Sequence, residues 1–167
     1  MEKNYAFSSS DVSKLVGITP IYLNAIVQRK LYGISPSISE RHGEMRMRIF
    51  SEEDLFGIAL VWSLFESGLR TQTIREVLLQ LVEVEDANAA ADHLSRPGGA
   101  YLVIVRGSSK SKGKAKPHLR AEAVLREDVT ELVGECVEEH PTANILLVPV
   151  GTKFAEVEKK IQVMYGE

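Results

Sequence analysis

The sequence predicts an α+β protein in which a mainly helical N-terminal part precedes a small α/β domain with a three-stranded sheet. In the first half, apolar residues recur at helical spacing, and one stretch alternates apolar with basic residues. After Arg96-Pro97-Gly98-Gly99, continuous apolar runs alternate with amphipathic stretches. We therefore expect two domains, 1–96 and 100–167.

The first two helices are predicted by capping residues and apolar spacing. Residues 8–11 are all Ser or Asp, which favour the N-cap position, and apolar residues follow at helical spacing up to residue 16. Gly17 ends this pattern. Thr19 offers a second cap with Pro20 at the first helical position, and an apolar stripe follows over 23–27. Two short helices joined at this turn predict a helix-turn-helix.

A β-hairpin is predicted next. Over 45–50, Met and Ile alternate with Arg at the strand period of two, and 37–41 supplies the preceding strand. Gly43 lies near the expected tip.

Two further helices follow the hairpin. Residues 51–54 have the spacing of a capping box and open a very apolar helix over 52–67, which Gly68 closes. A longer helical pattern then runs over 71–94.

The C-terminal half predicts a sheet with helices packed on it. Residues 100–105 and 143–150 are continuous apolar runs, as expected for strands covered on both faces, and 119–125 alternates weakly as a third strand. Two amphipathic helices are expected on the apolar stripes Val129, Leu132, Val133, Cys136 and Val137, and Phe154, Val157, Ile161 and Met164.

The segment 106–120 contains six basic and no acidic residues. Because it is small, polar and poor in apolar side chains, we expect a mobile loop. It is either a solvated loop or an auxiliary arm that follows a nucleic-acid backbone or an anionic ligand. The residues of this candidate basic loop are Lys110, Lys112, Lys114 and Lys116.

Composition limits the class of protein. With 44% apolar and 26% charged residues, the chain is typical of a soluble globular protein, and the longest apolar stretch, 58–65, is far short of a membrane span. Cys136 is the single cysteine, which indicates a reducing, cytoplasmic context without disulfides. The histidines are scattered, and no nucleophile has a base nearby in the pattern. We therefore expect no metal, no cofactor, no enzyme activity and no membrane partner.

Several short motifs in the first half occur together in one known family. They are Tyr5-Ala6-Phe7, Leu15-Val16-Gly17-Ile18-Thr19, Pro36-Ser37-Ile38, the stretch from Arg48-Ile49-Phe50 to Asp54-Leu55, and Ser67-Gly68-Leu69 followed by Ile74-Arg75. In order and spacing they resemble the MerR-type winged helix-turn-helix of bacterial transcription regulators, over about half of the chain. The resemblance also implies that the helices over 52–67 and 71–94 form the family's helical hairpin. The chain departs from the family at Ala25 and Ile26, where an aromatic pair is usual. The family's Arg-Tyr at the exit of the wing appears here as Arg48-Ile49-Phe50, without the hydroxyl.

The resemblance implies a DNA-binding surface. The second helix would enter the major groove, where Asn and Gln can pair with adenine and Arg with guanine. The arginines and histidine of the hairpin would contact phosphates or the minor groove. The implied DNA-binding residues are Thr19, Tyr22, Asn24, Gln28 and Arg29 in the helix region, and Arg41, His42, Arg46 and Arg48 in the hairpin.

The sequence thus predicts a sequence-specific DNA-binding transcriptional regulator. The resemblance implies double-stranded DNA and a second copy of the chain as partners, with RNA polymerase as a further candidate. A small-molecule or protein effector would bind the C-terminal domain, and the dimer would use 74–94 or the C-terminal sheet. Two alternatives stay open: an adaptor module that keeps the winged-helix fold with weak or no DNA binding, and an enzyme housed in the α/β half, which would need a pocket with convergent polar groups.

Overall fold

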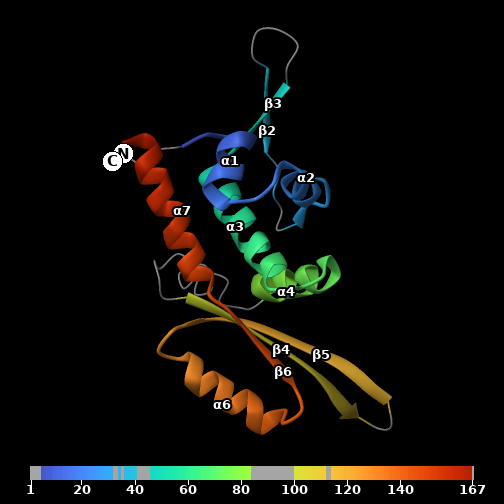
Figure 1. The fold of residues 1–167 in the computed structure, drawn as a ribbon. Coiled ribbons are helices and arrows are strands. Elements are labelled where there is room, and N and C mark those ends of the chain that lie inside the picture. Colours follow the sequence, from blue (N-terminus) through green and yellow to red (C-terminus); the bar gives the residue numbers. More distant parts are fainter. Residues whose placement is uncertain are drawn as a thin grey trace. The chain divides into compact units, whose positions relative to one another are not determined.

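The computed structural model describes residues 5–31, 34, 36–40, 46–83, 100–111 and 114–166 (Figure 1). The chain divides into two compact units: unit 1 contains 1–66 and 156–167, and unit 2 contains 67–155. The break expected at 96–99 lies outside the described residues. The described part has six helices and two three-stranded sheets, which agrees with the predicted α+β class.

Unit 1 begins with a short strand and two helices. β1 (Phe7–Ser8) leads into α1 (Ser9–Val16), and α2 (Pro20–Gln28) follows. Ser8 and Asp11 form a capping box: the Ser8 Oγ accepts from the Asp11 N–H at 3.2 Å, and the Asp11 Oδ2 accepts from the Ser8 N–H at 2.9 Å. Both predicted helices are confirmed. β1 was not predicted, because two residues are too few to show a strand period.

The sheet of unit 1 contains the expected hairpin. β2 (Ser37–Glu40) and β3 (Arg46–Phe50) are antiparallel, from Ser37 opposite Ile49 to Glu40 opposite Arg46. β1 pairs with the other edge of β3, where Phe7 faces Phe50 in the register. The pairing confirms the predicted hairpin, and its expected tip at Gly43 lies outside the described residues.

The central helix of unit 1 is α3 (Glu52–Glu66). Its predicted capping box is present, because the Asp54 N–H donates to the Ser51 Oγ and the Ser51 N–H donates to the Asp54 Oδ2, both at 3.1 Å. After α3, Gly68 has φ +83°, a conformation that favours glycine. The largest fully buried side chains of the unit come from its strands, its first three helices and the segment after α2: Phe7, Leu15, Leu23, Ile26, Leu31, Phe50, Leu55, Ile58, Leu60 and Leu64.

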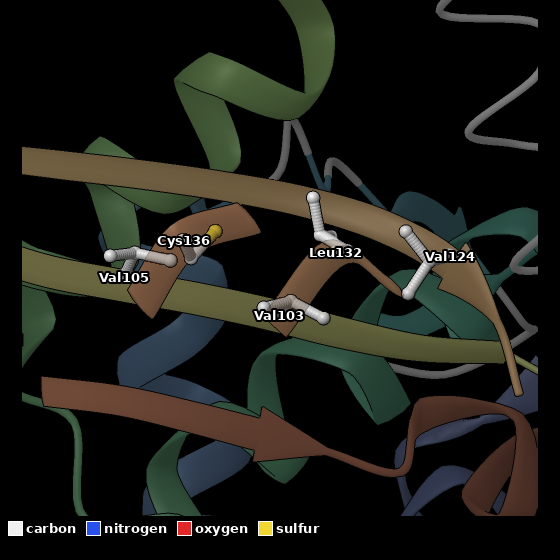
Figure 2. Packing of buried hydrophobic residues seen from close by; sticks show 5 residues of the cluster. All are labelled: Val103, Val105, Val124, Leu132 and Cys136. Carbon is white, nitrogen blue, oxygen red and sulfur yellow. The ribbon is translucent and has the colours of Figure 1, made fainter. Parts of the chain in front are cut away.

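Unit 2 is an antiparallel sheet with a helix packed on it. β4 (Ala100–Ser111) lies between β5 (Lys114–Leu125) and β6 (Asn144–Val148). Figure 2 shows Leu132 and Cys136 of α6 (Val129–Glu139) beside three valines of β4 and β5. α4 (Thr71–Glu83) packs against β5. Successive residues 102–105 of β4 are all buried, so both faces of β4 are covered there, as its apolar run predicted.

A glutamine of α4 covers the open edge of β5. The Gln80 Nε2 donates to the Leu119 carbonyl at 2.6 Å, and the Gln80 Oε1 accepts from the Ala121 N–H at 2.7 Å. Because β5 pairs only with β4, these backbone groups lie on its outer edge, and the side-chain amide bonds them as a neighbouring strand would.

The prediction of a loop over 106–120 was wrong. β4 continues to Ser111 and β5 starts at Lys114, with paired positions from Gly107 opposite His118 to Ser111 opposite Lys114. Antiparallel pairing is already set by the apolar residues nearer the base, and each further pair adds backbone hydrogen bonds that need no particular side chain. The low apolar content therefore did not prevent strand formation.

The last helix also differs from its prediction. α7 (Val150–Tyr165) starts inside the stretch expected to be a strand, so that residues 151–153 form its first turn. Its residues up to Ala155 belong to unit 2 and the remainder to unit 1. Val137 of α6 and Met164 of α7, expected on apolar stripes, are 49% and 41% exposed. The pattern beyond Glu83, expected to continue α4, lies outside the described residues.

Candidate nucleic-acid interface

The turn between α1 and α2 fixes how α2 is presented. Gly17 has φ +77°, and the N–H groups of Gly17 and Ile18 donate to the Ser13 carbonyl at 3.0 and 3.1 Å, which closes the end of α1. Thr19 is extended and Pro20 starts α2. Leu23 and Ile26 are 1% exposed, so the opposite side of α2 is left to solvent.

All five predicted base-reading residues of this region lie at the surface. Thr19 precedes α2 as its N-cap, and Arg29 follows it as its C-cap. The five exposed residues are Thr19, Tyr22, Asn24, Gln28 and Arg29. Their exposure meets the first geometric requirement for contact with a groove.

Asn24 and Arg48 are joined in the structure. The Arg48 Nη1 donates to the Asn24 Oδ1 at 2.6 Å, a short bond in which the donor is charged. Asn24 belongs to α2 and Arg48 to β3, so the bond links the helix to the hairpin at the surface. Two predicted site residues from separate elements are thus brought together.

Tyr22 packs on a tryptophan of α3. Its ring centroid lies 5.1 Å from that of Trp62, at an interplanar angle of 49°. The Trp62 Nε1 is buried and has no hydrogen-bond partner among the described residues. The Tyr22 ring is thus packed on Trp62, while 49% of the residue remains exposed.

Other predicted residues are placed in part or lie outside the description. Arg46 stands opposite Glu40 in the strand register, and its side chain lies outside the described part. Arg41 and His42 belong to the undescribed tip of the hairpin. These two predictions are therefore not tested.

The second group of basic residues lies on the long hairpin of unit 2. Lys110 pairs with Ala115, Lys114 with Ser111 and Lys116 with Ser109 in the β4–β5 register. Lys112 lies outside the described residues. β6 pairs with β4 only over 102–106, so these positions belong to the two-stranded part of the hairpin.

Sequence reasoning missed two exposed apolar residues beside the predicted site. Ile21 of α2 is 79% exposed, and Met47 of β3 is 38% exposed. The helical phase gave a usable signal for Ile21, because it is out of step with the buried pair Leu23 and Ile26. Nothing in the strand pattern distinguished Met47 from a buried residue.

Unit 2 contains an ionic cluster beside the single cysteine. The Arg120 guanidinium bonds the Glu122 carboxylate at 2.8 Å, and this hydrogen bond raises the pKa of Arg120. Burial raises the pKa of the Cys136 thiol. A thiol in this state is protonated at neutral pH and is a poor nucleophile.

Neither metal-binding groups nor membrane-crossing helices occur in the described part of the chain. Among those residues, no three His, Cys, Asp or Glu side chains are grouped to hold a metal ion. Within the same ranges, every helix is too short or too polar to cross a membrane.

Comparison with known proteins leaves the family open. No protein-family model matches the chain, and no curated protein matches it significantly.

Proposed function

We propose that the chain is a sequence-specific DNA-binding transcriptional regulator, and that its N-terminal domain, expected over 1–96, is a winged helix-turn-helix of the MerR-like type with a linking helix. The observation that supports this most is the bond between Asn24 and Arg48. It joins the exposed face of α2 to the β2–β3 hairpin in one polar surface, as is required if a helix reads bases while a flanking hairpin contacts phosphates.

The bond leaves both residues with groups that can recognise DNA. It uses one of the two lone pairs of the Asn24 Oδ1, so Asn24 keeps an acceptor site as well as its amide N–H donors. The remaining guanidinium N–H groups of Arg48 suit phosphate oxygens or the O6 and N7 acceptors of guanine. Adenine needs a donor and an acceptor together, and Asn24 still has both while bonded to Arg48.

The proposal includes further partners. By the family resemblance, the protein acts as a homodimer on inverted repeats in double-stranded DNA and works with RNA polymerase. The β4–β5 hairpin serves as an auxiliary basic arm, because Lys110, Lys114 and Lys116 lie in its two-stranded part. An effector, small molecule or protein, would act through unit 2. The protein has no enzymatic role in this proposal.

The test is enrichment of fragmented genomic DNA from the source organism on the purified protein at about 150 mM salt, with affinities then measured on the enriched sequences. We expect a shared motif that the Arg46→Ala/Arg48→Ala variant fails to enrich. The charge-matched control is Arg70→Ala/Arg126→Ala, which removes two exposed arginines of unit 2 and should leave the motif unchanged. Asn24→Ala breaks the same bond without changing charge, and should alter sequence preference more than the salt dependence of binding.

The competing function is an adaptor module that keeps this fold and binds a protein. Ile21 favours it, because a 79% exposed isoleucine next to Tyr22 is better suited to an apolar partner than to a nucleic acid. Enrichment no greater than that of a non-binding control protein would reject the regulator. Discrimination between the motif and random DNA by several kcal/mol would reject the adaptor.

A further inference from the structure

A groove runs between α1 and α7 within unit 1. Its volume is about 560 Å³, and it lies away from the predicted DNA-binding face, because Figure 1 shows α7 and α2 on opposite sides of α1. Nothing in the proposed function uses it. The side chains that matter for its chemistry are Lys14 and Leu15 of α1 and Lys159, Lys160, Val163 and Met164 of α7.

The two helices that form the groove are fastened to each other and to the unit. The Lys160 Nζ donates to the Leu15 carbonyl at 3.0 Å, in the last turn of α1. The Tyr165 ring lies 4.7 Å from that of Tyr5 and 6.1 Å from that of Phe7, centroid to centroid. Val157 and Ile161 are buried. The groove therefore exists before any partner arrives, which lowers the entropy cost of binding.

Apolar side chains are exposed inside this groove. Val163 is 75% exposed and Met164 is 41% exposed, whereas Val157 and Ile161 of the same helix are buried. Neighbouring exposed apolar side chains are typical of a surface that a partner covers. Methionine is also suited to such a surface, because its flexible side chain adapts to different shapes.

The charges around these apolar residues are mostly positive. The lining residues include three lysines, Lys14, Lys159 and Lys160, and one carboxylate, Glu156. The Lys160 ammonium is held by the Leu15 carbonyl and keeps two N–H donors. Lysines beside an apolar floor are complementary to a surface that combines carboxylates with apolar side chains.

We propose that the groove binds an amphipathic helix of a partner protein, with acidic residues flanking its apolar stripe. The apolar stripe would cover Val163 and Met164, and the carboxylates would pair with Lys14 and Lys159, in the way that helices dock into apolar grooves. Nucleic acid fits less well, because its phosphates would be placed against Val163 and Met164. Two copies of this groove facing each other would bring like charges together.

The test uses a displayed library of helical peptides, about 15 residues long, randomised on one face. Selection is done on the full-length protein alone, and the selected peptides are then measured on the Lys159→Glu/Val163→Glu variant, which leaves the Lys160 bond in place. The control is Val137→Glu, which puts a carboxylate on an exposed valine of unit 2, 49% exposed against 75% for Val163. Circular dichroism verifies that each variant folds.

We expect selected peptides to carry Asp or Glu beside Leu, Ile or Phe at helical spacing. The groove variant should weaken their binding at least about tenfold, equivalent to about 1.4 kcal/mol, and the control should not change it. Peptides with a basic flank, or equal binding to the variant, would overturn the proposal. So would a shift from dimer to monomer in the groove variant by analytical ultracentrifugation, because it would assign the groove to a second copy. DNA enrichment by the groove variant should stay normal, so the two proposals fail separately.

Discussion

The two β-hairpins of the molecule have the same organisation at different lengths. β2 and β3 pair over four positions, and β1 joins them only at Ile49 and Phe50. β4 and β5 pair over twelve positions, and β6 joins them only at 102–106. In each hairpin a third strand supports the base. Beyond the base the short hairpin has arginines at 46 and 48, and the long hairpin has lysines over 110–116, while Arg106 and Arg120 belong to the base of the long hairpin.

The difference in length shows that the residues that fix the strand register and the residues that extend the hairpin are different sets. At the base, apolar side chains must match the cover above and below them, and they fix the register. Beyond the base the strands follow that register, so composition is free to serve another purpose. Beyond its base, the short hairpin has arginines at alternate positions, 46 and 48. The long hairpin has lysines among small residues.

The largest effect is expected from breaking the base of the short hairpin. Phe50 is fully buried, and Phe50→Ala should lower the free energy of unfolding by about 3–5 kcal/mol. Val105→Ala, at the base of the long hairpin, should cost about 2 kcal/mol because fewer buried methyl groups are lost. Hydrogen exchange read by mass spectrometry should show faster exchange in β2 and β3 for the first variant, and in β4 and β5 for the second. If hydrogen exchange became faster to the same extent in both units in either variant, the two hairpin bases would not be independently stabilised.

The edge of the long hairpin gives the next effect. Gln80→Leu removes both bonds to β5 and leaves the Leu119 carbonyl and the Ala121 N–H without these partners, at a cost of about 1–3 kcal/mol. Gln72→Leu is the matched control, because Gln72 lies on the exposed side of the same helix and bonds only Glu76 across one turn. Urea unfolding compares the two. Equal midpoints would mean that the edge of β5 does not need Gln80.

The smallest effect concerns the far end of the long hairpin. If it is an auxiliary arm, Lys114→Ala/Lys116→Ala should weaken binding to enriched and to random DNA by the same factor, about 3- to 10-fold at about 150 mM salt. The slope of log affinity against log salt should fall by about 1.8, for two phosphate contacts. Fluorescence anisotropy over a salt series measures both quantities. An unchanged slope would mean that these lysines do not contact DNA. Arg70→Ala/Arg126→Ala again serves as the control.

The sequence predicted elements best where a local rule and burial agreed. One of the four N-cap candidates over 8–11, Ser8, caps α1. The capping box at Ser51, the stop at Gly17 and the strand over 46–50 were found as expected, and each depends on residues close in sequence. The continuation of β4 and β5 beyond the base depends on pairing between distant segments, which composition does not encode. The bonds from Gln80 to the edge of β5 likewise join segments that are distant in sequence.

The exposure of the candidate residues around α2 was predictable, but their bonds were not. Exposure of the base-reading residues follows from helical phase once Leu23 and Ile26 are assigned to the core. The bond from Arg48 to Asn24 joins residues that are 24 positions apart, and the contact of Tyr22 with Trp62 joins residues 40 apart. Such contacts depend on how the elements pack, which a single sequence leaves open.

The path of α7 has a consequence for anyone who dissects this protein. Because the helix leaves unit 2 at Ala155 and ends in unit 1, the chain crosses between the units twice, at 66–67 and at 155–156. Unit 2 is therefore an insertion into unit 1 rather than a tail behind it. A deletion after residue 149 would remove Val157 and Ile161 from the first unit's core, so a minimal version of unit 1 has to keep 156–166 and close the gap with a linker.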